Sequence, residues 1–141
     1  MREVLEVPSA RWAAERGQPQ VVARMRTAHD RLLERSKQEP IDFDQPQLLD
    51  VAFHQSIVEA AGNQFLEQTQ GVLGEVLVRG KSTTLTAKGR LEASRTDHLA
   101  ILEAIVAGNG VRAAAAARLH VRARRTALAL FGDSDPSLNI G

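Results

Sequence analysis

Apolar residues recur along this chain at intervals of three and four positions, the spacing that places side chains on one face of an α-helix. Strict alternation of apolar and polar residues, which is typical of a half-buried strand, does not occur. Glycine and proline separate the periodic segments, because glycine readily ends a helix and proline interrupts its hydrogen bonds. The pattern predicts six helices, which cover approximately residues 3–15, 19–36, 46–61, 63–79, 90–107 and 111–131.

Individual residues set the predicted ends of these helices. Pro8 interrupts the first helix, which is therefore either kinked or begins near Ser9. Gly62 ends the third helix. Asn63 is a good N-cap for the fourth helix, because its side-chain oxygen can accept a hydrogen bond from a backbone N–H of the first turn.

Small residues in two of the predicted helices bear on how they pack. Gly71 and Gly74 each lower helix propensity by about 1 kcal/mol relative to alanine, which suggests close helix packing or a space left open. The sixth helix contains five consecutive alanines at 113–117, whose small side chains let helices approach closely. Short loops between the helices predict an all-α antiparallel bundle over residues 1–132, followed by a flexible tail at 133–141.

The composition excludes several classes of protein. The chain has 141 residues, which predicts one domain, and its net charge of +1 is too small for a free-standing nucleic-acid binder. No apolar run approaches the roughly 20 residues of a membrane span, and the first residues do not form a signal peptide. The absence of cysteine excludes disulfides and thiolate metal ligands. We therefore expect a cytoplasmic protein without a membrane partner.

Three of the four histidines lie on inward faces of three different predicted helices: His54, His98 and His120. Apolar or small residues at helical spacing share these faces, namely Phe53, Ile57, Leu91, Ile101, Ile105, Ala113 and Ala116. The fourth, His29, precedes Asp30 and Arg31 in a charged stretch, and we expect it at the surface.

Asp50 precedes His54 by one helical turn and lies on the same face. The pair alone could simply stabilise its helix, and each histidine alone could be a hydrogen-bonded core residue. Jointly, Asp50, His54, His98 and His120 predict a divalent metal site, because imidazole is the commonest metal ligand and a carboxylate adds a fourth donor. Nitrogen and oxygen donors suit Zn²⁺ or Ni²⁺, which we favour, with Mn²⁺, Fe²⁺ and Co²⁺ as alternatives.

The segments around these residues resemble a known family. Asp50-x-x-x-His54, followed by Glu-Ala-Ala-Gly-Asn at 59–63, is similar to the signature of the FCD domain, the C-terminal effector domain of FadR-type transcriptional regulators in the GntR superfamily. Residues 97–105, Asp-His-Leu-Ala-Ile-Leu-Glu-Ala-Ile, resemble a second motif of that domain, and residues 3–16 resemble its first helix. Asp97 stands where the family often has glutamate, and Asn109 where it often has aspartate.

The resemblance implies an antiparallel helical bundle with a divalent ion held at its centre by one aspartate and three histidines. On this chain those ligands are Asp50, His54, His98 and His120. The resemblance also implies a small organic acid effector beside the metal. Arg79 is the candidate partner of that acid, and Asn63 is a helix cap first and a pocket residue second. A homodimer is a further expectation from the family.

The leading hypothesis is therefore the ligand-sensing and dimerisation domain of a transcriptional regulator, which is not an enzyme. In the family a winged helix-turn-helix precedes this domain, whereas the present chain begins within what resembles the domain's first helix. We expect a truncated chain or gene product that lacks the DNA-binding domain, so that this chain alone does not bind DNA.

Two other functions compete with this hypothesis. A metal-dependent hydrolase or lyase would need a general base, for which Glu59 and Glu103 are candidates, although both are expected to be exposed. Direct nucleic-acid binding would use arginines of the sixth predicted helix, but these are scattered around it and are expected at the solvated surface. They are Arg112, Arg118, Arg122, Arg124 and Arg125.

Overall fold

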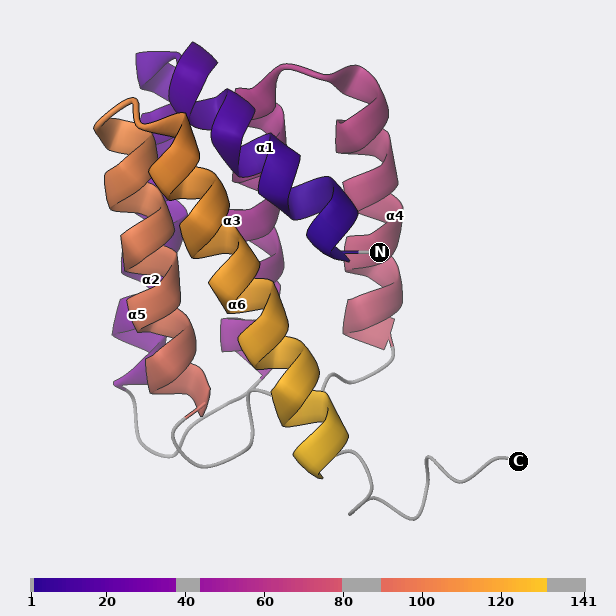
Figure 1. The fold of residues 1–141 in the computed structure, drawn as a ribbon. Coiled ribbons are helices and arrows are strands. Elements are labelled where there is room, and N and C mark those ends of the chain that lie inside the picture. The colour runs from indigo at the N-terminus through magenta and orange to yellow at the C-terminus, as the bar shows by residue number, and fades with distance from the viewer. Residues whose placement is uncertain (1, 38–43, 80–89, 132–141) are drawn as a thin grey trace.

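The computed structural model describes residues 2–37, 44–79 and 90–131, which form six helices and, within those ranges, no strand (Figure 1). The helices are α1 (Arg2–Arg16), α2 (Pro19–Ser36), α3 (Asp44–Ala61), α4 (Gln64–Arg79), α5 (Arg90–Val106) and α6 (Gly110–Phe131). No end differs from its predicted position by more than two residues. The predicted all-α fold is confirmed, while the predicted tail at 133–141 lies outside the described residues.

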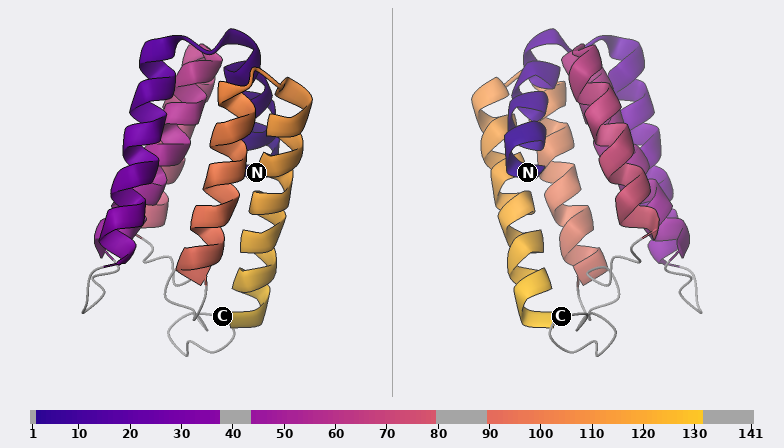
Figure 2. Two further views of the ribbon diagram at one scale, coloured as in Figure 1. Left: turned by 90° about the vertical axis from the view of Figure 1, so that its left-hand side faces the viewer. Right: turned by 90° about the vertical axis from the view of Figure 1, so that its right-hand side faces the viewer.

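The helices α2, α3, α5 and α6 run along a common long axis, and α1 lies obliquely across one half of the bundle (Figures 1 and 2). Helix α1 packs against both α3 and α6, helix α2 against α3 and α5, and helix α5 against α6. Helix α4 packs mainly on α3. Helix α1 therefore bridges two helices, α3 and α6, that do not follow each other in the chain.

Gly62 and Asn63 set the end of α3 and the start of α4, as predicted. Gly62 and Gly108 adopt φ values of 70° and 69°, the left-handed region that glycine enters without steric penalty. Gly62 follows α3 directly, and Gly108 lies two residues after the last residue of α5. The Asn63 Oδ1 accepts the N–H groups of the second and third residues of α4 at 3.0 and 3.3 Å. Asn109 caps α6 in the same way, at 3.0 Å from the N of Arg112.

Helix α1 does not begin near Ser9, which was one of the two alternatives for Pro8. It runs from Arg2 through Pro8, although proline has no N–H to donate to the carbonyl of Val4. The Ser9 hydroxyl instead donates to the carbonyl of Leu5 in the same turn. Helix α1 is thus continuous, but its internal hydrogen bonding is weakened at the second turn.

Among the described side chains, few large ones are almost fully buried, and α1 and α6 meet largely through alanines. Phe53, Met25 and Ile101 are the largest apolar side chains that are almost fully buried. On the two contacting helices the buried alanines are Ala10, Ala13, Ala14, Ala113 and Ala117. At Gly71 the structure agrees with the second alternative, an open space, since an added Cβ would meet no atom within 4 Å. The surroundings of Gly74 lie outside the described part of the structure.

Two substitutions within the alanine run test this packing. Ala113 is 0% exposed, whereas Ala115 is exposed on the same helix. Ala113→Leu should lower the free energy of unfolding by roughly 1–3 kcal/mol, because the added atoms must displace α1 or α5. Ala115→Leu should change it by no more than about 0.5 kcal/mol. Urea unfolding of both variants is the measurement, and equal effects would contradict the buried packing of Ala113.

Candidate metal centre

Three helices place one histidine each at the centre of the bundle. His54 comes from α3, His98 from α5 and His120 from α6, and their exposed fractions are 2%, 0% and 0%. One ring nitrogen of each lies within 4.8 Å of the others, which is the spacing of a group that could hold a metal ion. Helical periodicity placed each histidine on an inward face, and the packing of the helices makes those faces converge.

The three rings are in mutual contact. The Nε2 atoms of His54 and His120 are 3.3 Å apart, and the two rings are stacked at an interplanar angle of 16°. The ring of His98 lies edge-on to both, with centroid distances of 5.0 Å to His54 and 4.8 Å to His120. Phe53 stacks on the ring of His98 at 4.3 Å between centroids and closes that side with an apolar surface.

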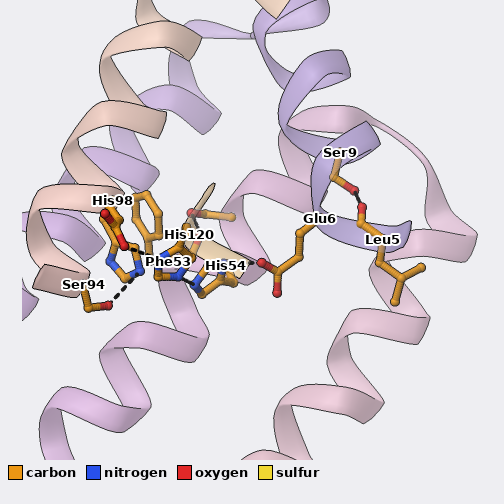
Figure 3. Close-up of polar contacts among 10 residues, drawn as sticks. Leu5, Glu6, Ser9, Phe53, His54, Ser94, His98 and His120 are labelled. Atoms are coloured by element: carbon orange, nitrogen blue, oxygen red, sulfur yellow. Dashed lines mark hydrogen bonds and ion pairs between the residues drawn. The ribbon is translucent and has the colours of Figure 1, made fainter. Parts of the chain in front are cut away.

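Oxygen atoms contact these imidazoles from outside the cluster. The Asp97 Oδ2 lies 3.1 Å from the Nδ1 of His120, a distance at which that nitrogen donates a hydrogen bond. The Glu6 Oε2 of α1 lies 3.3 Å from the Nδ1 of His54, and Figure 3 shows Glu6 pointing from α1 toward that ring. The Ser94 Oγ lies 3.5 Å from the Nε2 of His98. Such outer partners fix the tautomer and orientation of imidazoles that bind metals.

The structure describes less of the other predicted site residues. Asp50 is helical and lies one turn before His54, and Arg79 is the last residue of α4, but both side chains lie outside the described part of the structure. Asn63 is described as a helix cap, because its Oδ1 accepts two backbone N–H groups of α4. These three residues therefore lie in or at the start of the helices where the sequence predicts them. Their roles in binding a metal or an effector stay predictions.

His29 is not at the surface, contrary to expectation, for it is only 5% exposed. It continues an inward row of α2 with Val21 and Met25 at four-residue spacing, whereas its charged neighbours in sequence point away. Its ring lies 6.0 Å from that of Phe53. Burial is the main cause that lowers the pKa of His29, Arg95 and Arg26 lower it further, and Asp30 opposes them.

Arg124 is the second correction, since it is 7% exposed and not solvated as expected. It extends the inward row of α6 that contains Ala113, Ala117 and His120, and a long arginine stem can be buried along such a row. The other four arginines of this group are exposed, as predicted: Arg112, Arg118, Arg122 and Arg125.

Sequence reasoning did not predict the contacts of Ser94, Asp97 and Glu6 with the histidines, and Glu6 is the one that comes from α1. It shares a face of α1 with Ala10 and Ala13, four and seven residues later, and both alanines are fully buried. That spacing was a readable signal for an inward carboxylate. It was weak because alanine occurs on buried and exposed helix faces alike, as Ala113 and Ala115 show.

The fold and the site together define an all-α domain built around a buried polar centre, and three of its buried histidines could hold a metal ion. A family model described as the FCD domain matches residues 1–123, and the chain belongs to this family. The FCD domain is the ligand-sensing regulatory domain of GntR-type regulators. A comparison with curated proteins found no match. In the described part of the chain, no helix combines the length and apolarity needed to cross a membrane.

The pH dependence of stability tests the burial of His29. The pKa of His29 is lowered from its ordinary value of 6.5, so below pH 6.5 the unfolded chain takes up a proton that the folded chain resists. The contribution of the neutral His29 to the free energy of unfolding is therefore complete above pH 6.5, and it is lost as the pH falls below 6.5. In His29→Leu the free energy of unfolding should therefore decline less steeply below pH 6.5 than in the wild type. Urea unfolding at several pH values measures both slopes, and identical slopes would contradict the buried, neutral imidazole.

Proposed function

We propose that this chain is the sensing domain of a GntR-type transcriptional regulator, that it binds a divalent metal through Asp50, His54, His98 and His120, and that it binds a small carboxylic acid beside that metal. The observation that carries the proposal is the convergence of three buried imidazoles from three helices. Membership of the FCD family supports the sensing role.

The spacing of the histidine nitrogens supports a metal ligand set. Two imidazoles that bind one zinc ion tetrahedrally, each at about 2.0–2.1 Å, have their nitrogens roughly 3.4 Å apart. The Nε2 atoms of His54 and His120 are 3.3 Å apart. The Asp97 carboxylate lies 3.1 Å from the Nδ1 of His120 and favours a proton there, which leaves the Nε2 lone pair of that ring for a metal. The Glu6 carboxylate lies 3.3 Å from the Nδ1 of His54, whereas the Nε2 of that ring lies toward His120.

The charges around the cluster support a divalent ion. Three neutral imidazoles would add no charge to that of the ion, and the carboxylates of Glu6 and Asp97 contact two of these imidazoles, those of His54 and His120. Asp50, one turn before His54, would supply the hard oxygen donor that the described side chains do not include. Nitrogen and oxygen donors favour Zn²⁺ or Ni²⁺, and Mn²⁺, Fe²⁺ and Co²⁺ are the alternatives.

A metal that takes more than four ligands would keep open coordination positions after the four protein ligands have bound. A carboxylate of the effector would occupy these positions. The second end of such an acid needs a cation, for which Arg79 at the end of α4 is our candidate. Asn63 uses its Oδ1 as a cap, which leaves its amide N–H groups as the donors for a bound acid. Binding of the acid would shift the conformational equilibrium of a homodimer in the cytoplasm. A winged-helix domain, not this one, would contact DNA.

The competing hydrolase hypothesis gains no support from its candidate bases. Glu59 forms an ion pair with Arg24 at 3.4 Å, and Glu103 forms one with Arg112 at 3.7 Å. Both pairs lie at the surface, because Arg24 and Arg112 are exposed and the Glu103 side chain is 57% exposed. A metal-dependent base would have to lie beside the histidine cluster.

Metal binding by histidine variants tests the ligand set. The chelator-treated wild type should bind one Zn²⁺ or Ni²⁺ per chain in a calorimetric titration. His54→Ala, His98→Ala and His120→Ala should each weaken binding by more than the roughly 10–100-fold that loss of an outer-shell partner causes. His29→Leu removes a buried histidine outside the cluster and should bind like the wild type. Unchanged metal content in His98→Ala and His120→Ala would refute the site.

Binding of small acids tests the sensing role. Acetate, lactate, succinate and benzoate are titrated into the metal-loaded and metal-free chain, and at least one should bind only when metal is present. Arg79→Gln should weaken that binding by about 1.5–3 kcal/mol, the contribution of a hydrogen bond to a charged group. Arg24→Gln, which changes an exposed arginine, is the matched control and should have no effect. Equal binding with and without metal would contradict the role of the metal.

A further inference from the structure

Glu6 is a buried carboxylate on the first turns of α1. It is 4% exposed, and its Oε2 lies 3.3 Å from the Nδ1 of His54 (Figure 3). A carboxylate removed from water is costly unless positive charge or donors face it. Glu6 is not part of the group of His54, His98 and His120 that could hold an ion, so it acts on that group from outside.

The segment that carries Glu6 is weakly joined to the rest of α1. Pro8 follows two residues later and has no N–H, so the helical hydrogen bond to the carbonyl of Val4 is missing. Since an interior proline lowers helix stability by about 3 kcal/mol, residues 2–7 depend on side-chain contacts for their position. Leu5 and Val7 supply apolar contacts, for both are 8% exposed.

Glu3 joins this segment to α6 through ion pairs. It lies 3.7 Å from Arg118, 3.3 Å from Arg122 and 3.7 Å from Arg125. The three arginine side chains are 45%, 61% and 65% exposed, so these ion pairs are screened by solvent and each adds little. The contact of Glu6 with His54 is instead almost fully buried, and it joins α1 to a residue of the proposed metal site.

We propose that Glu6 is a positioning residue that couples the N-terminal segment of α1, residues 2–7, to metal bound at His54. This inference rests on the proposed metal site. The carboxylate holds the Nδ1 side of the imidazole, so that the opposite nitrogen faces His120, and the positive charge of a bound ion strengthens that contact through the ring. By linkage, the metal then favours the position in which residues 2–7 pack against the bundle with Glu6 at His54. Packing of residues 2–7 in that position in turn favours metal binding.

Asp97 provides a matched comparison. It bears the same group and contacts another ligand histidine, His120, at 3.1 Å, but it belongs to α5. Removing either carboxylate should weaken metal binding by a similar factor, because each orients one imidazole. Only the removal of the Glu6 carboxylate should also let residues 2–7 of α1 detach from the bundle.

Hydrogen exchange followed by mass spectrometry tests this coupling in the 141-residue chain, with and without saturating Zn²⁺. The informative amides are those of residues 6–10 other than Pro8, since the first four N–H groups of a helix have no carbonyl partner. In the wild type, Zn²⁺ should slow their exchange about 5-fold or more. In Glu6→Gln at saturating Zn²⁺ that protection should be lost, while α5 and α6 remain protected. Asp97→Asn at saturating Zn²⁺ should keep the protection of residues 6–10.

The outcomes separate the two proposals. If neither the wild type nor the variants bind Zn²⁺, the metal site itself is refuted, and the coupling with it. If the wild type binds Zn²⁺ without any slowing at residues 6–10, the coupling alone is refuted, and this result does not depend on any variant folding. If residues 6–10 are equally protected from hydrogen exchange in Glu6→Gln and in the wild type, Glu6 has no positioning role.

Discussion

Three imidazole rings occupy the place where α3, α5 and α6 meet, a place that an ordinary helical bundle would fill with apolar side chains. Each ring is at most 2% exposed, so water cannot satisfy its nitrogens, and the neighbouring helices must do so. Asp97 and Ser94 of α5 and Glu6 of α1 are the described oxygens that reach the rings. The relative positions of four helices are therefore tied to one polar cluster, because moving α1 away from α3, or α6 away from α3 or α5, breaks a contact of a buried ring nitrogen.

The rest of the bundle can be understood as support for that cluster. Alanines on α1 and α6 let these two helices approach closely, and α1, which also packs on α3, places the Glu6 Oε2 3.3 Å from the Nδ1 of His54. Phe53 lies one residue before His54 and covers the ring of His98, so a single turn of α3 supplies both a proposed ligand and its apolar wall. Small residues thus set the distances between helices, and the few large side chains exclude water from the centre.

The inward rows of the helices account for both the successes and the errors of sequence reasoning. Periodicity correctly placed His54, His98 and His120 inside, because apolar or alanine neighbours mark their faces. His29 was assigned to the surface from its neighbours in sequence, although the residues four and eight positions earlier, Met25 and Val21, define its face. Arg124 was misplaced for a related reason, since its charge outweighed a row made mostly of alanine. Adjacent residues on a helix point in different directions, so local charge is a poor guide to burial.

The amino-acid sequence by itself determined the helices, their ends and the inward direction of His54, His98 and His120, because these follow from local propensity, capping and a period of 3.6 residues per turn. Only the tertiary structure decided which atoms meet. The contact of His54 with His120 spans 66 positions along the chain, and that of Glu6 with His54 joins two helices separated by a third. No local rule fixes such pairs, because the distance and rotation between two helices depend on the side chains packed at their interface.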